Sequence, residues 1–158
     1  MNKNLLILFL IVLIGSVVVF FYTRPYYKAV TVYDDYATYD EAYNAAITYA
    51  REINGVPIGR RGTGSNDWAG SNMGKTGIFV GDLYPYEKLE VGMLIGWTLE
   101  EKRDGITIQS TIIHRIALID KEGVHTRGDA NSTMDKIIVT PDNYQFRVVA
   151  LFKPTDSK

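Results

Sequence analysis

The longest apolar run of the chain lies at its amino terminus, where residues 5–22 carry no charge and only Ser16 is clearly polar. As an α-helix, this run would extend roughly 27 Å, close to the thickness of a bilayer's hydrocarbon core. Arg24 and Pro25 then end the pattern. We expect residues 1–30 to form a retained membrane anchor with its juxtamembrane segment. A cleaved signal peptide is the alternative, although no small-x-small cleavage site follows the run, and a buried core helix is a third possibility.

The next segment, residues 31–57, has apolar side chains at helical spacing. Between residues 34 and 54 they recur every three or four positions, at Tyr36, Tyr39, Tyr43, Ala46, Ile47, Ala50 and Ile53. Thr38 and Glu41 fit a capping box at the start of a helix, and Gly55 fits its end. The pattern predicts an amphipathic, tyrosine-rich helix that packs on the rest of the domain or on a neighbouring chain.

A glycine-rich break follows the predicted helix. Residues 59–77 contain six glycines in nineteen positions, which disfavours a regular element. The triplet at residues 74–76, Gly-Lys-Thr, is similar to the end of a phosphate-binding loop. The first glycine of that motif is replaced by Ala69, no strong strand precedes it and no helical pattern follows. A phosphate-binding role is therefore disfavoured.

After the break, short apolar segments alternate with turn residues, a pattern typical of β-strands. The predicted strands are Ile78–Val80, Met93–Leu99, Ile106–Asp120, Val124–Arg127, Lys136–Thr140 and Gln145–Lys153. Asp104-Gly105 and Glu122-Gly123 have the composition of hairpin turns. The chain is therefore expected to be mostly β, with an antiparallel β domain over residues 58–158 preceded by one transmembrane helix and one amphipathic helix.

The longest predicted strand has an apolar and a polar face. The apolar face holds the even positions Ile106, Ile108, Ile112, His114, Ile116 and Leu118, whereas the opposite face is mostly polar. His114 thus lies on the apolar side, where two interpretations stay open. It is either a core histidine with satisfied hydrogen bonds or a neutral imidazole, kept partly dry and competent as a base. The other histidine, His125, is expected to be exposed beside a turn.

Composition narrows the chemistry further. The 158 residues suffice for one domain of ordinary size. The absence of cysteine excludes disulfides, thiolate metal sites and a cysteine nucleophile, and two histidines are too few for a multi-histidine metal centre. No cofactor is expected. Residues 1–30 carry three basic and no acidic side chains, whereas residues 31–158 carry 14 basic and 18 acidic ones, a net charge of −4. That charge disfavours nucleic acid as a partner, and it disfavours binding of residues 31–158 to the surface of an anionic membrane.

Three motifs of the second half together resemble a known family. Residues 112–116 read Ile-Ile-His-Arg-Ile, residues 126–131 read Thr-Arg-Gly-Asp-Ala-Asn, and Asp135 follows. This series is similar to the carboxy-terminal signature of type I signal peptidases, in the endoplasmic-reticulum and archaeal branch and its short phage and bacterial relatives. In that branch, a His-Arg pair replaces the catalytic lysine of the bacterial enzymes, and an aspartate stands six residues after that of the G-D-x-N motif. The resemblance covers roughly residues 58–153.

The resemblance implies a membrane-anchored serine endopeptidase that cleaves exported or membrane-tethered polypeptides. It also implies a β domain of the signal-peptidase type, a single membrane pass and a catalytic domain outside the cytoplasm. Ser65, after Gly62-Thr-Gly, matches the nucleophile position best, and Ser71 is the second choice. His114 would be the general base, Asp135 would orient its imidazole, and Asp129 would support the site.

Two departures from the family pattern motivate an alternative. Asn66 follows the first-choice serine where the family has methionine, and Met93 stands where it usually has aspartate. A catalytically inactive relative, retained as a binding or assembly module, would tolerate both. The related self-cleaving repressors fit less well, because they use a lysine base and a DNA-binding domain, whereas this chain has a histidine and an apolar amino terminus.

Overall fold

The structure, a computed structural model, describes residues 30–61 and 76–155, without the side chains of residues 58–61 and 76. The predicted anchor at residues 5–22 and both candidate nucleophiles, Ser65 and Ser71, lie outside the described residues. Within the described ranges, no helix is long and apolar enough to cross a bilayer.

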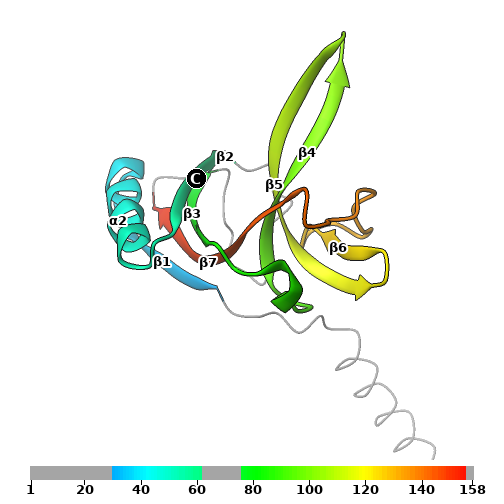
Figure 1. Cartoon of the computed structure of the whole chain (residues 1–158). Coiled ribbons are helices and arrows are strands. Elements are labelled where there is room, and N and C mark those ends of the chain that lie inside the picture. Colours follow the sequence, from blue (N-terminus) through cyan, green and yellow to red (C-terminus); the bar gives the residue numbers. More distant parts are fainter. Residues whose placement is uncertain (1–29, 62–75, 156–158) are drawn as a thin grey trace, which may run out of the picture.

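The described chain forms one seven-stranded sheet with one α-helix beside it (Figure 1). The elements are β1 (Thr31–Tyr36), α2 (Tyr39–Glu52), β2 (Val56–Arg61), β3 (Thr76–Asp82), a 3₁₀ turn at Tyr86–Lys88, β4 (Leu94–Arg103), β5 (Ile106–Asp120), β6 (Gly123–Arg127) and β7 (Tyr144–Pro154). The strand order is β2-β3-β7-β4-β5-β6, and β1 also pairs with β7. All pairs are antiparallel except β1 with β7. The prediction of a mostly β, antiparallel domain is confirmed.

Strand β7 is central because it is long enough to pair with three strands. Its residues 147–152 pair with β3. Its residues 144–147 pair with β4, and its residues 150–154 pair with β1. Contact between β4 and β7 requires glycine, since a Cβ at Gly96 would lie 2.1 Å from Cζ of Phe146. The close approach holds β4, and with it the β4–β5 hairpin, against the centre of the sheet.

Helix α2 begins where the capping residues predict, and its buried face includes Ala46 and Ala50 of the predicted stripe but not Tyr39 and Tyr43. The Thr38 hydroxyl accepts a hydrogen bond from the Glu41 amide, at 3.3 Å. Its buried line is Ala42, Ala46 and Ala50, which pack against β3 and β7. The exposed Tyr39 and Tyr43 stack on each other instead, and Tyr36 belongs to strand β1. Small alanines bring the helix close to the sheet, which leaves the larger tyrosines at its margin.

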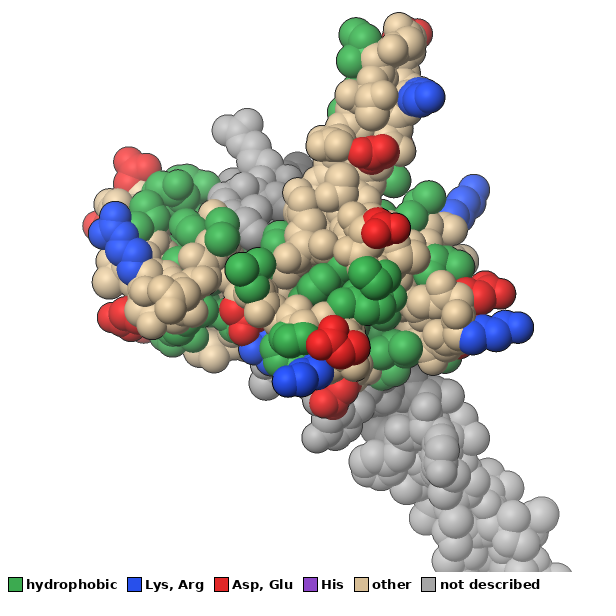
Figure 2. Space-filling view, viewed as in Figure 1, with side chains coloured by type: hydrophobic (Ala, Val, Ile, Leu, Met, Phe, Trp, Pro, Cys, Tyr) green, Lys and Arg blue, Asp and Glu red, His purple; other side chains and the backbone are tan. Residues whose placement is uncertain are grey.

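One predicted strand and the burial of another also need correction. Lys136–Thr140 is not a strand, because Val139 makes only an isolated bridge with Val124. Strand β5 has the predicted bounds, but its first half is not half-buried: Ile106 is 66% exposed and Ile108 is 41% exposed. The β4–β5 hairpin projects beyond the sheet in Figures 1 and 2, so none of the other described elements covers these side chains. Its turn is the predicted one, with positive φ at Asp104 (52°) and Gly105 (79°).

Candidate active site

His114 and Arg115 are adjacent residues of β5, and consecutive side chains of a strand point to opposite faces. Their positions oppose Ile95 and Leu94 of β4, and Arg115 is also opposite Arg127 of β6. Pairing on both sides makes this half of β5 rigid. Both residues are buried, unlike the projecting half of the same strand. Because burying an ionisable side chain is costly without a hydrogen-bonding or charged partner, each of these two consecutive residues needs one.

The segment that follows β6 supplies these partners, and backbone hydrogen bonds fix its path. The amide of Asn131 donates to the Gly128 carbonyl at 2.8 Å, which closes a turn. The amide of Asp135 donates to the Thr126 carbonyl at 2.8 Å, which returns the chain to β6. Val139 then exchanges two backbone hydrogen bonds with Val124, at 2.8 and 2.9 Å. These contacts hold the segment beside β6 and bring both aspartates to β5.

Asp135 lies beside His114. The imidazole Nδ1 is 2.7 Å from Asp135 Oδ2, and the same oxygen accepts a 2.6 Å hydrogen bond from the Thr126 hydroxyl. The side chains of His114 and Asp135 are 11% and 17% exposed, so both lie at the border of the core. Ile95, which is paired opposite His114, and Ile116, on the same face of β5, belong to an apolar cluster. Its members are Leu89, Met93, Ile95, Trp97, Ile116, Val124 and Val139. The histidine therefore has a carboxylate partner and limited access to water.

Asp129 lies beside Arg115 instead. Arg115 Nε is 2.9 Å from Oδ1 of Asp129, and Nη2 is 3.1 Å from Oδ2, which is a two-pronged contact. Arg115 Nη1 donates a further hydrogen bond to the Gly92 carbonyl at 2.7 Å. Gly92 has a φ of 91°, a backbone conformation that favours glycine. The arginine thus ties the loop before β4 to the segment after β6.

The structure brings together two of the four predicted site residues and separates a third. His114 and Asp135 are in contact, whereas the described partner of Asp129 is Arg115. The fourth, Ser65, lies outside the described residues, as does the alternative Ser71. Asp129 is therefore not the carboxylate that contacts the imidazole.

Sequence reasoning missed Thr126, which is fully buried and contacts Asp135. The alternation of β6 was the available signal, because Val124 and Thr126 share the buried face and one of them is polar. The expectation for His125 also needs correction. It is only partly exposed, and its Nε2 lies 3.1 Å from Asp120 Oδ2.

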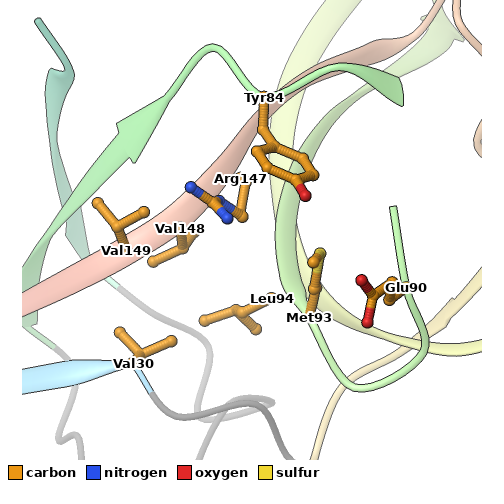
Figure 3. Close-up of a pocket in the computed structure, with 8 residues that line it drawn as sticks. All are labelled: Val30, Tyr84, Glu90, Met93, Leu94, Arg147, Val148 and Val149. Carbon is orange, nitrogen blue, oxygen red and sulfur yellow. The ribbon is translucent and has the colours of Figure 1, made fainter. Parts of the chain in front are cut away.

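A cavity of about 340 Å³ lies near the loop between β3 and β4 (Figure 3). It is lined by Val30, Tyr84, Glu90, Met93, Leu94, Arg147, Val148 and Val149. The Arg147 guanidinium stacks 3.9 Å from the centre of the Tyr84 ring and is hydrogen-bonded to both carboxylate oxygens of Asp82. The hydrogen bond to Asp82 raises the pKa of Arg147. None of the lining residues belongs to the His114–Asp135–Thr126 group.

No protein-family model matches the chain, and neither a curated protein nor a solved structure matches it significantly.

Proposed function

We propose that this protein is a membrane-anchored serine endopeptidase of the signal peptidase I type, which cleaves exported or membrane-tethered polypeptides. The observation that carries the proposal is the 2.7 Å contact between His114 Nδ1 and Asp135 Oδ2. The two residues are 21 positions apart, on a strand and on a separate loop, so local geometry alone does not bring them together. A buried imidazole with a carboxylate on one ring nitrogen is the arrangement that a serine nucleophile requires of its base.

In the proposed reaction, the neutral His114 ring donates its Nδ1 proton to Asp135 in a hydrogen bond. Nε2 takes the proton of a serine hydroxyl while the serine oxygen attacks the carbonyl carbon of the scissile bond. The protonated ring then gives that proton to the leaving amine, the C–N bond breaks, and an acyl ester remains on the serine. A water molecule, deprotonated by the same Nε2, hydrolyses the ester and restores the enzyme. Asp135 stays ionised throughout and stabilises the imidazolium.

The nucleophile is Ser65 in our proposal, with Ser71 as the second candidate. The proposed architecture adds a transmembrane helix at residues 5–22 to a β domain of the signal-peptidase type, with that domain outside the cytoplasm. Polypeptide is the substrate, and the lipid bilayer is the other partner. No cofactor enters the reaction, because oxygen and nitrogen groups of the chain and one water account for every bond and proton.

The test uses the full-length protein in detergent micelles and a membrane-tethered polypeptide with small residues before the cleavage site. We expect the wild type to cleave it. The single variant His114→Ala should lose at least about 1,000-fold in kcat, and so should one of the two single variants Ser65→Ala and Ser71→Ala. His125→Ala is the matched control and should cleave like the wild type. Equal cleavage by the wild type and His114→Ala would overturn the proposal.

Met93 favours a second candidate function. It occupies a position that is usually an aspartate in the family, and here it is buried in the apolar cluster that includes Ile95 and Ile116. An inactive relative would keep the fold as a binding or assembly module. In the same assay, such a module would retain the polypeptide uncut, and the wild type would hold it as tightly as His114→Ala does.

A further inference from the structure

The Thr126 hydroxyl is a buried polar group in an apolar setting. Thr126 is fully buried, and its neighbour on the same face of β6, Val124, belongs to the apolar cluster. A valine at position 126 would have nearly the same shape and no polar group to satisfy. The hydroxyl has one described partner, Oδ2 of Asp135, at 2.6 Å.

The same carboxylate oxygen contacts His114, and this constrains the proton on the imidazole. Oδ2 of Asp135 lies 2.7 Å from Nδ1 and 2.6 Å from the threonine hydroxyl. A hydroxyl has a single proton, and an ionised carboxylate is only an acceptor. When Thr126 donates to an ionised Asp135, a hydrogen bond from the ring requires the proton on Nδ1. The neutral ring then has its lone pair on Nε2.

Thr126 also holds the backbone of Asp135. Its carbonyl accepts the Asp135 amide at 2.8 Å, so the two residues are joined at the main chain and at the side chain. The main-chain bond fixes the position of Asp135 Cα, and the hydroxyl fixes the rotation of its carboxylate. Val139, which exchanges backbone hydrogen bonds with Val124, anchors the segment on the other side of Asp135.

We propose that Thr126 is a positioning residue: its hydroxyl orients the carboxylate of Asp135 and thereby holds the neutral His114 ring in the tautomer protonated at Nδ1. The effect on catalysis rests on the proposed peptidase function, because only this tautomer can accept a serine proton at Nε2. The effect on the tautomer does not rest on it. The two are therefore measured separately.

The experiment compares Thr126→Val, which removes the hydroxyl, with Thr126→Ser, which keeps it. Thr111→Val is the matched control, because it removes a β5 hydroxyl that bonds to Gln145 at 3.2 Å and does not contact Asp135. Full-length protein labelled with ¹⁵N-histidine is studied by NMR in micelles, at a pH where the rings are neutral. A His125→Gln variant assigns the signals, because the chain has only two histidines.

We expect the wild type, Thr126→Ser and Thr111→Val to give the ¹⁵N shifts of a ring protonated at Nδ1, and Thr126→Val to shift toward protonation at Nε2. In the cleavage assay, Thr126→Val should lower kcat about 10- to 100-fold with KM unchanged within about twofold, as expected for a misplaced catalytic group. Thr126→Ser should retain kcat within about threefold of the wild type. This split between kcat and KM is not expected of a purely structural role.

An unchanged tautomer in Thr126→Val would overturn the proposal, as would an unchanged kcat in an active enzyme. If the wild type cleaves nothing while the tautomer shifts, the peptidase function fails and the positioning role holds. If Thr126→Val does not fold, Thr126→Ala replaces it in the comparison with Thr126→Ser, since these two differ only by the hydroxyl. Equal tautomers in that pair would overturn the proposal.

Discussion

Two adjacent residues of β5 each pair with an aspartate from the segment after β6, and the two pairs differ in exposure and in geometry. The side chains of Arg115 and Asp129 are 3% and 4% exposed, whereas those of His114 and Asp135 are 11% and 17% exposed. Arg115 makes a two-pronged contact and also reaches the Gly92 carbonyl. His114 uses one ring nitrogen toward Asp135.

The exposure and geometry of the two pairs suit Arg115–Asp129 to a structural role and His114–Asp135 to proton transfer. A guanidinium keeps its proton in proteins, and a buried two-pronged ion pair is costly to break. An imidazole exchanges its proton near neutral pH. The buried Arg115–Asp129 pair therefore joins β5, the loop before β4 and the segment after β6. The more accessible His114–Asp135 pair combines a group that can accept a proton with a carboxylate that orients it. Because His114 and Arg115 are consecutive residues of β5, the two pairs are fixed in position relative to each other.

The largest effect should come from Asp135→Asn. The amide cannot accept from Nδ1 and stabilise the imidazolium as a carboxylate does, so kcat for the tethered substrate should fall about 1,000- to 10,000-fold. Asp135→Asn should lower the free energy of unfolding less than Asp129→Asn does, because the His114–Asp135 pair is more exposed than the Arg115–Asp129 pair. Cleavage rates and urea unfolding of the full chain in micelles measure the two effects. Comparable activity in Asp135→Asn and the wild type would remove the distinction between the pairs.

The second effect should appear in stability instead of activity. Asp129→Asn removes the carboxylate that makes the described two-pronged contact with the buried Arg115 charge, which should lower the free energy of unfolding by about 3–5 kcal/mol. Arg115→Lys should lower the free energy of unfolding less than Asp129→Asn does, since it keeps a positive charge opposite Asp129 and loses only the two-pronged contact. Urea unfolding gives the free energies, and activity is expressed per folded molecule. Loss of activity without loss of stability in Asp129→Asn would contradict the structural role.

Local signals in the sequence predicted local structure well. Asp104-Gly105 makes the hairpin turn because both residues take positive φ, and Thr38 caps α2 as its spacing predicts. The burial of β5 was not predictable from alternation alone. Ile106 and His114 have the same parity in the strand, but only the half near His114 is covered by the rest of the fold. Periodicity gives the face of a strand, whereas burial depends on what packs against that face.

The family resemblance assigned Asp135 to His114, and the structure has this contact, but the spacing of the residues alone left Asp129 and Asp135 as alternatives. Asp129 and Asp135 follow the same strand six residues apart, and either can reach β5 in principle. The choice depends on the turn closed by Asn131 and on the hydrogen bond that returns Asp135 to Thr126. These contacts are specific to the folded loop. Strand β1 was missed for a related reason: it is mostly exposed, and its Tyr36 continued the helical spacing of the next segment.

A smaller effect is expected at a second buried hydroxyl, which contrasts with Thr126. Among the described residues, the Tyr144 hydroxyl has no hydrogen-bond partner, and burial raises the pKa of Tyr144 to about 12. Tyr144→Phe should therefore be neutral or stabilise the protein by up to about 1 kcal/mol at neutral pH. The unfolded tyrosine ionises first, with a pKa near 10.0. Ionisation thus lowers wild-type stability as pH rises from about 10 toward 12, where the advantage of the variant should increase.

Urea unfolding at the same pH values measures the free energies of unfolding of Tyr144→Phe and of Thr126→Val, which is the control. Thr126→Val removes a satisfied hydroxyl and leaves Asp135 with one donor fewer, so it should not gain stability. A loss of more than about 1 kcal/mol in Tyr144→Phe would mean that the hydroxyl is satisfied after all.

The smallest effect should come from the second histidine–aspartate pair, His125 with Asp120. It is more exposed than the His114 pair, with 17% and 39% of the two side chains accessible. The Glu122 amide and, more weakly, His125 lower the pKa of Asp120. The stabilisation that this provides is present above pH 3.8 and is lost as pH falls below that value. His125→Ala should shift the melting temperature by less than about 2 °C at neutral pH and leave kcat unchanged. A large loss of kcat would show that contact with an aspartate does not by itself distinguish the two histidines, and the assignment of the base to His114 would then lose its basis.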